Sequence, residues 1–347
     1  MPFCACPLLS DLWESPMRRT PLAIFAALTA LPALHAAAQE TPVLTVYTYD
    51  SFDTEWGPGP RIEPAFEERC GCDLQFVGAG DGAALLARLR LEGGNTDADV
   101  VLGLDTALTA AARDTGLFAP HGIEVPPLDL PVDWQDDTFV PFDWGYFAFV
   151  HARDFDPPAN FRDLADSEAQ VVIQDPRSST PGLGLLMWVK AAYGDAAPEI
   201  WEGLADNIVT VTKGWSEAYG LFLDGEADMV LSYTTSPAYH VAAEADDTKT
   251  AAPFDEGHYL QVEVAARLAG SDQPELARDF LDFMLTAPFQ TAIPETNWMY
   301  PAVTPEAGLP AAYDGLIRPG TALLLSPDEA RAIRDTALDE WLTALSR

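Results

Sequence analysis

The 347-residue chain carries 19 basic and 54 acidic residues, a formal net charge of −35 at pH 7, and 48% of its residues are hydrophobic. A field of this sign repels nucleic acid and anionic lipid, which excludes both as partners. It favours cationic ligands, but a solvated acidic surface is the commoner cause, so the charge alone identifies no ligand.

The first 38 residues predict a secretory signal peptide. Met17-Arg18-Arg19 begins a basic segment, Leu22 to Leu34 is apolar, and Ala36-Ala37-Ala38 is a cleavage site before Gln39. The apolar run is too short to span a bilayer comfortably. We therefore expect translation to start at Met17 and the mature protein to be exported and soluble.

The mature chain is expected to keep two cysteines, Cys70 and Cys72, separated by one glycine. An oxidising compartment favours a local disulfide between them over two free thiols. A bridge across one residue is tight, and a metal site would need further ligands. We expect a structural disulfide.

Strands and helices alternate through the first third of the mature chain. The expected strands are Val43–Tyr47, Leu74–Val77 and Asp99–Leu102; a helix over residues 62–68 follows Pro58-Gly59-Pro60, and Leu85, Leu86 and Leu89 mark the next helix. This alternation predicts a mostly parallel sheet with helices on both faces.

Two longer strands are expected to cross between lobes. Phe139–Val150 is the first, and Tyr259–Ala266, whose side chains alternate in and out, is the second. Because the chain exceeds the usual size of one core, we predict a clamshell of two α/β lobes. Lobe 1 comprises residues 39–142 and about 263–347, and lobe 2 comprises residues 143–262.

The second lobe is expected to contain a strand at Val171–Gln174 and a helix at Leu185–Ala192. Beyond it, Leu276, Phe280, Phe283 and Met284 mark an amphipathic helix. Ser326-Pro327-Asp328-Glu329 is a capping box. It starts a final helix with an apolar stripe, which can pack on either lobe; the stripe comprises Ile333, Ala337, Trp341 and Leu345.

The stretch from Thr210 to His240 reads as strand, helix and strand. Ser216 is a candidate N-cap, Gly225 stands where a left-handed residue would end the helix, and Met229–Leu231 is a buried strand. Tyr219, Phe222 and Leu223 are expected to share one helical face.

Polar and aromatic residues gather at the ends of these strands. Tyr233-Thr234-Thr235-Ser236 lies at the carboxyl end of the second strand, where ligands bind in open α/β sheets, and Trp215 lies at the matching place after the first. Such residues suit a small ligand with a cationic ring and a polar or phosphate tail.

A second loop rich in hydroxyls, Gln174–Gly184, runs from a strand into a helix. Backbone N–H groups and hydroxyls at a helix N-terminus hold an oxyanion well, although an ordinary N-cap has the same composition. Asp81, in a glycine-rich turn, either caps the next helix or accepts hydrogen bonds from a ligand amine. Aromatic residues at predicted strand ends or in loops are further candidates for the wall of a site: Tyr49, Trp56, Tyr239 and Trp298.

Catalytic motifs are absent from the sequence. The five histidines have no metal-binding spacing, there is no G-x-S-x-G elbow, and the two cysteines have no evident activating base. We expect no enzymatic activity, no cofactor and no metal.

Motifs along nearly the whole mature chain resemble those of the periplasmic thiamine-binding proteins of bacterial ABC importers. They are long and keep their order: LTVYTYDSF (Leu44–Phe52), WGPGP (Trp56–Pro60), ADVVLGLD (Ala98–Asp105), QDPRSSTPGLG (Gln174–Gly184), TVTKGWSEAYGLFL (Thr210–Leu223), LSYTTSPAYH (Leu231–His240), GHYLQVEVAA (Gly257–Ala266) and NWMYP (Asn297–Pro301). The resemblance implies the type II periplasmic binding-protein fold, with the ligand held between the lobes.

The resemblance also implies a role for each candidate. It assigns Asp81-Gly82 to the aminopyrimidine side of thiamine and Trp215 to the ring system. Ser179-Thr180 and Tyr233–Ser236 would meet the hydroxyethyl or phosphate end, and Tyr49, Trp56, Tyr239 and Trp298 would add aromatic wall. A departure is Gly80-Asp81-Gly82-Ala83-Ala84, where the family carries bulkier residues.

The function that the resemblance implies is a periplasmic, monomeric carrier. It would capture thiamine, thiamine phosphate or thiamine diphosphate and deliver it to a membrane permease with its ATPase. Two alternatives remain open: a carrier for another small cation, a polyamine or a ferric ion, and an exported thiamine-processing enzyme. Iron would want paired tyrosine or carboxylate ligands, a polyamine several carboxylates, and an enzyme a nucleophile with its base.

Overall fold

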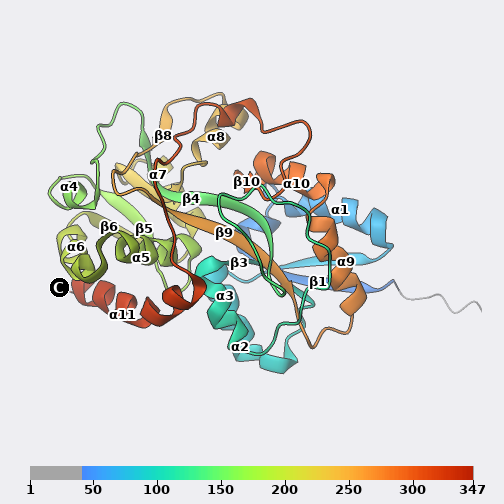
Figure 1. Ribbon diagram of the computed structural model, residues 1–347. Helices are drawn as coiled ribbons and strands as arrows, with labels where there is room; N and C mark the ends of the chain where they lie inside the picture. Colours follow the sequence, from blue (N-terminus) through green and yellow to red (C-terminus); the bar gives the residue numbers. More distant parts are fainter. Residues whose placement is uncertain (1–40, 347) are drawn as a thin grey trace, which may run out of the picture. The chain divides into compact units, whose positions relative to one another are not determined.

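Two long antiparallel strands, β4 and β9, lie in the middle of one mixed sheet (Figure 1). The computed structural model describes residues 41–346, so the predicted signal peptide lies outside the described residues. The order of the sheet is β2-β1-β3-β9-β4-β7-β5-β6, with β8 and β10 paired to β4 and β11 to β9. The strands are β1 Val43–Thr48, β2 Asp73–Gly78, β3 Val100–Asp105, β4 Val140–Ala152, β5 Val171–Gln174, β6 Ile208–Thr212, β7 Met229–Tyr233, β8 Lys249–Ala251, β9 His258–Arg267, β10 Tyr300–Pro301 and β11 Ala322–Leu323.

Helices connect the strands and cover the sheet. The α-helices are α1 Gly59–Cys70, α2 Gly82–Glu92, α3 Thr106–Arg113, α4 Phe161–Ala165, α5 Thr180–Tyr193, α6 Ala197–Leu204, α7 Trp215–Leu223, α8 Pro237–Tyr239, α9 Pro274–Met284, α10 Ala287–Ala292 and α11 Pro327–Leu345. Short 3-10 segments are η1 Asp50–Asp53, η2 Gly93–Asn95, η3 Gly194–Ala196 and η6 Ala311–Tyr313, and η4 His240–Glu244 and η5 Ile293–Asn297 are π-helical.

Parallel pairs form the two ends of the sheet, and antiparallel pairs form its centre. β1 pairs in parallel with β2 and β3, and β5 pairs in parallel with β6 and β7. β4 uses its first half, Val140–Tyr146, to pair with β9 and its second half, Phe147–His151, to pair with β7. The chain therefore passes from one end of the sheet to the other along β4, as the crossing predicted at Phe139–Val150 requires.

Most predicted elements are present, with ends that differ by a few residues. The helix expected from residue 62 begins at Gly59. Pro60 lies in its first turn, where the missing N–H breaks no helical hydrogen bond, so the proline does not delay the start of the helix. α5 begins at Thr180, five residues before the predicted start. The short or alanine-rich helices α3, α4, α6, α8 and α10 were not predicted from the sequence.

Two local predictions are wrong. The strand β9 does not alternate in and out: His258 to Ala266 are all buried, because both faces of the sheet are covered there. Ser216 is not an N-cap; α7 begins one residue earlier, at Trp215, with Gly214 in the capping position. In the same helix Tyr219 and Phe222 are buried as expected, whereas Leu223 is 48% exposed.

Other features agree with the sequence. Gly225 has a φ of +81° just beyond the end of α7. Ser326 and Glu329 form the capping box of α11, which contacts α3, α5 and α6. These partners lie in both predicted lobes, so α11 spans them. The lobe boundaries themselves stay a prediction, since residues 41–346 form one compact unit.

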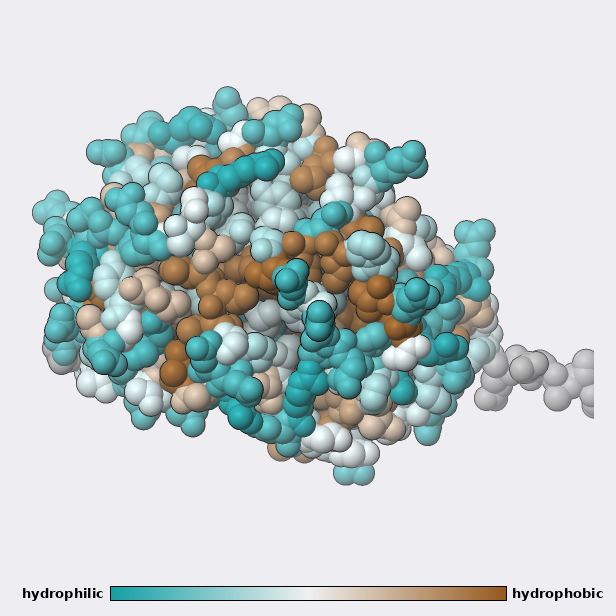
Figure 2. Space-filling model, in the orientation of Figure 1, coloured by the Kyte–Doolittle hydropathy of each residue, from teal (hydrophilic) through white to brown (hydrophobic). Residues whose placement is uncertain are grey.

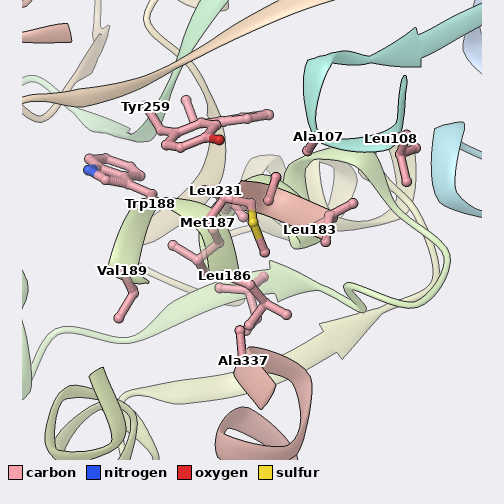
Figure 3. Close-up of a cluster of buried hydrophobic side chains, with 14 of the residues drawn as sticks. Ala107, Leu108, Leu183, Leu186, Met187, Trp188, Val189, Leu231, Tyr259 and Ala337 are labelled. Atoms are coloured by element: carbon pink, nitrogen blue, oxygen red, sulfur yellow. The ribbon is translucent and has the colours of Figure 1, made fainter. Parts of the chain in front are cut away.

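The largest buried cluster lies where α5 meets the sheet (Figure 3). Its side chains come from α5, α3, β7, β9 and α11, and include Leu183, Met187, Trp188, Leu108, Leu231, Tyr259 and Ala337. A second cluster packs α1, α9 and α10 against the β1 end of the sheet. Hydrophobic residues also gather in a band across the face shown in Figure 2, with hydrophilic residues on either side.

Cys70 and Cys72 are joined by a disulfide at the C-terminal end of α1. Gly71 between them has a φ of +63°, a backbone conformation that glycine adopts without penalty. None of the described helices has the length and apolar character that a membrane span requires.

We expect Gly184→Ala to destabilise the protein. An added Cβ would lie 2.1 Å from a ring carbon of Phe147 in β4, so α5 and β4 would have to move apart. Overpacking of this kind costs on the order of 1–3 kcal/mol. Gly220→Ala in α7 is the matched control, because no atom within 4 Å opposes its Cβ; it is expected to gain roughly 0.5–1 kcal/mol. Urea unfolding of both variants tests this, and equal free energies of unfolding would contradict it.

Candidate functional site

The N-termini of three helices meet at Asp81. Asp81 is the N-cap residue of α2, and its carboxylate accepts a hydrogen bond of 3.2 Å from the backbone N–H of Trp215, the first residue of α7. Gly82 N–H donates to the Thr180 hydroxyl at the start of α5 at 3.0 Å. A Cβ on Gly82 would lie 2.7 Å from both that hydroxyl and the Gly103 carbonyl, so only glycine allows this approach.

A cavity of about 270 Å³ opens beside this junction. It lies at the carboxyl ends of parallel strands, where the sequence placed the ligand, since Tyr49 follows β1 and Tyr233 ends β7. The predicted residues that line it are Asp81, Thr180, Trp215, Tyr233, Ser236, Tyr49, Trp56, Tyr239 and Trp298.

Aromatic rings form much of the wall. The half-buried indole of Trp215 stacks on Tyr219, with ring centroids 5.1 Å apart and planes at 29°, and Trp56 lies 6.4 Å from it. Trp298 and Tyr239 pack edge to face at 5.6 Å. Trp298 has a φ of +56°, which a bulky residue rarely adopts, and it follows the π-helix η5. Such conformations concentrate at functional sites.

Hydroxyl groups hold the Trp215 ring in place. Its Nε1–H donates to Ser232 Oγ at 2.7 Å, and Ser232 Oγ lies 2.7 Å from Ser236 Oγ. Ser236 Oγ also accepts a bond of 3.2 Å from the backbone N–H of Tyr233. Ser236 of the predicted segment thus lines the cavity and supports the tryptophan through Ser232, which was not predicted.

Four predicted residues do not line the cavity. Gly82 and Ser179 are buried behind it, at the helix junction. Thr235 is buried and donates to Met299 Sδ at 3.7 Å. Thr234 faces a different cavity, of about 220 Å³, together with Arg153 and Lys249. Residues 234–236 form a turn between β7 and α8, so successive side chains point in different directions and only Tyr233 and Ser236 reach the cavity.

The cavity also contains residues that were not predicted: Ser51, Pro181, Ser216, Tyr219, Gly220, Leu223, Glu263, Thr296, Asn297 and Met299. Glu263 had a signal in the sequence, a lone acid within the apolar strand Tyr259–Ala266. Asn297 is the first residue of a motif whose tryptophan was chosen. The others are ordinary residues on elements that bring them to the site.

Glu263 belongs to a buried polar network. Its carboxylate accepts hydrogen bonds from Tyr49 OH at 3.2 Å and Gln261 Nε2 at 2.8 Å. Asn297 Nδ2 donates to Tyr49 OH at 2.8 Å and to Asp143 Oδ2 at 2.7 Å. Asp143 is 0% and Glu263 5% exposed. Removal from water disfavours ionised carboxyls, and burial raises the pKa of Asp143 to about 7.

Carboxylates provide the charge of the cavity lining. Among the described residues that line it, the charged side chains are Asp81 and Glu263, and none is a lysine or arginine. Burial raises the pKa of Asp81 to about 6. Hydrogen bonds from the Ser179 side chain and the Trp215 N–H lower this pKa and offset part of the rise. The cavity therefore suits a ligand that is aromatic and positively charged, or rich in hydrogen-bond donors.

Comparison with known proteins identifies the family. Residues 57–291 match the family described as bacterial extracellular solute-binding protein. The chain belongs to this family.

Two relatives within the family are informative for this solute-binding protein. It is 56% identical over 310 residues to the thiamine-binding periplasmic protein of Escherichia coli (strain K12), which covers 88% of this chain and 94% of that protein. A solved periplasmic thiamin binding protein superposes with a TM-score of 0.86 at 56% identity, over 88% of this chain and 97% of that one. These matches confirm the resemblance and the two-lobed α/β fold predicted from the sequence.

A more distant structure shares the fold alone. The iron-bound HitA of Pseudomonas aeruginosa superposes with a TM-score of 0.71 but is 20% identical, over 87% of this chain and 99% of that one. At that identity its ligand says nothing about this solute-binding protein.

Asp81→Asn should stabilise the ligand-free protein in a pH-dependent way. The pKa of Asp81 is about 6 in the folded protein, against an ordinary value of 3.8, so folding disfavours the ionised carboxylate. Stability is therefore lost as pH rises from about 4 to 6, by about 3 kcal/mol when complete.

Removal of this carboxylate should recover that free energy at pH 8 but not at pH 4. Urea unfolding at the two pH values measures the difference, and Asp272→Asn, on an exposed residue, is the control. The same change in stability at both pH values would refute the assignment of a raised pKa to Asp81.

Proposed function

We propose that this protein captures thiamine in the periplasm, in the cavity beside Trp215, and delivers it to the permease of an ABC importer with its ATPase. Thiamine monophosphate and diphosphate are included as ligands. The thiamine-binding relatives, which match almost the full mature chain, support this function. Closure of the two lobes around the ligand, and a monomeric carrier, are part of the proposal.

The observation that carries the proposal is the composition of the cavity wall. Aromatic faces and two carboxylates line it without a cationic side chain among the described residues. The thiazolium ring of thiamine is a permanent cation, so it gains from aromatic faces and negative charge without exchanging a proton. Trp215, Trp56 and Trp298 are the aromatic groups best suited to this contact.

The phosphorylated forms suit the junction of helix N-termini. Thr180 begins α5 beside the cavity, and the positive end of that helix favours an anion. Thr180, Tyr233 and Ser236 add hydroxyls to the cavity wall there. Uncharged donors of this kind would accept both the free hydroxyethyl group and its phosphate esters.

The alternative ligands fit less well. Among residues 41–346, His240, Glu244 and Asp246 form the one group of at least three His, Cys or carboxylate ligands close enough to share a metal ion. None of these three lines the cavity. A polyamine would call for more than the two carboxylates at the wall. An exported thiamine-processing enzyme would convert thiamine to a product on incubation, whereas a carrier would leave it unchanged.

Native mass spectrometry of the protein as purified, followed by calorimetric titration of refolded, ligand-free protein, tests the function. We expect one thiamine or thiamine phosphate per chain, and unchanged thiamine after incubation. Absence of binding to all three thiamine forms would overturn the proposal. Conversion of thiamine to a product would favour the enzyme.

Replacement of Trp215 should weaken thiamine binding more than it weakens the fold. Trp215→Phe keeps a ring but loses the best cation–π face and the bond to Ser232, so we expect a loss of roughly 2- to 30-fold in affinity. Trp215→Ala should lose more. Calorimetry and thermal melts measure both effects.

Trp201→Phe is the control for a purely structural tryptophan, because Trp201 is 0% exposed and lies in α6 away from the cavity. It is expected to lower the melting temperature without changing affinity. If Trp215→Ala behaved as this control does, Trp215 would be a packing residue.

The double variant Ser179→Ala, Thr180→Ala should weaken the phosphate esters more than free thiamine. A hydrogen bond to a charged group is worth roughly 1.5–3 kcal/mol, against about 1 kcal/mol for a neutral one. Titration with thiamine and its two phosphates gives the three ratios. A uniform loss would mean that these hydroxyls only support the helix junction at Gly82.

A further inference from the structure

Three acidic residues lie side by side on the central strands. In the register of the sheet, Glu263 of β9 pairs with Asp105 of β3 on one side and with Asp143 of β4 on the other. Paired residues on neighbouring strands project to the same face. All three are buried, at 1%, 0% and 5% exposure for Asp105, Asp143 and Glu263. Buried carboxylates without a function are costly, so this row calls for an explanation.

Of the three, only Glu263 lines the cavity within the described part of the chain. Asp143 lies behind it, with Oδ2 bonded to Asn297 and Oδ1 buried without a donor among the described residues. Asp143 and Glu263 are direct partners in the register of β4 and β9, so their carboxyls project to the same face of the sheet. Neighbouring buried carboxyls oppose each other's ionisation, because two like charges close together are unfavourable.

The surroundings of Glu263 oppose its ionisation. Burial, and next the charge of Asp143, hold the pKa of Glu263 well above its usual range. The other groups near it are Tyr49, which follows β1, Asp105 of β3 and Tyr233 of β7, together with the amide of Gln261. The Asn297 amide connects Tyr49 to Asp143. Both tyrosines have raised pKa values through burial and stay neutral.

The geometry of the helix junction leaves one part of the ligand without a partner. The sequence resemblance assigns Asp81-Gly82 and Ser179-Thr180 to opposite ends of thiamine. Here they are joined by the bond from Gly82 N–H to Thr180 Oγ1, so they belong to one end of the site. If that end meets the hydroxyethyl or phosphate group, the aminopyrimidine needs a different acceptor.

We propose that Glu263, backed by Asp143, accepts a hydrogen bond from the exocyclic amino group of the bound aminopyrimidine. Besides Asp81, it is the charged group at the described wall of the cavity. Glu263 accepts hydrogen bonds from Tyr49 and Gln261 with one lone pair of each oxygen, so further lone pairs can accept a bond from the ligand. Negative charge on the carboxyls strengthens such a bond. This inference rests on the proposed thiamine function and names the group that selects its pyrimidine half.

The test compares thiamine with 4′-deaminothiamine, in which hydrogen replaces the amino group. For the wild-type protein we expect the loss of the amino group to weaken binding roughly 10- to 100-fold. In Glu263→Gln, whose neutral amide oxygen still accepts, the ratio should fall to about fivefold. In Glu263→Met, which has no acceptor, the two ligands should bind alike. Calorimetry gives the ratios, and thermal melts show that each variant is folded.

Two matched variants separate this role from rival explanations. Asp105→Asn alters the member of the acidic row on the other side of Glu263 from Asp143, which does not line the cavity, and should keep the wild-type ratio of the two affinities. Asp81→Asn alters the other carboxylate at the wall, and should also keep the wild-type ratio of the two affinities.

Each contrary outcome is distinct. Wild-type ratios in both Glu263 variants, or a ratio lost in Asp81→Asn, would overturn the role of Glu263 and leave thiamine binding intact. Failure of the wild-type protein to bind either ligand would overturn the proposed function and this inference with it.

Discussion

The antiparallel pairing of β4 with β9 is the constraint on which the site depends. β4 runs with β9 through Tyr146 and then pairs with β7, so one continuous strand connects the two ends of the sheet. The parallel strands on either side end near this crossing, and their following loops face one cavity. A ligand there touches segments that are far apart in the sequence, such as Tyr49 and Trp298. This arrangement is what a binding protein that closes around its ligand requires.

The centre of the sheet, around the crossing strands β4 and β9, also contains buried carboxyl groups that reduce the stability of the fold. Asp105, Asp143 and Glu263 lie in a row in the sheet centre, where apolar side chains would stabilise the protein more. Asp81 is held at a helix junction at a similar cost. Proteins retain costly buried carboxyls where function needs them. Both carboxylates at the cavity wall, Asp81 and Glu263, are of this kind.

Sequence patterns predicted the architecture well, because strand and helix periods and turn residues act locally. The sequence also placed Trp215 and the hydroxyl segments at strand ends, since the carboxyl edge of a parallel sheet is a general site for ligands. It could not predict which neighbours face the cavity: Thr234 and Thr235 point elsewhere. Nor could it reveal the Glu263–Asp143 pair, which depends on the register of strands about 120 residues apart. Which predicted residues bind ligand stays a prediction.

A crystal structure of the protein with thiamine would test the account most directly. It predicts the ring system in the cavity between Trp56, Trp215 and Trp298, with the amino group at Glu263 and the hydroxyethyl group at the junction of Asp81 and Thr180. Thiamine bound in another cavity, or in this one without contact to the tryptophans and to either carboxylate, would contradict it.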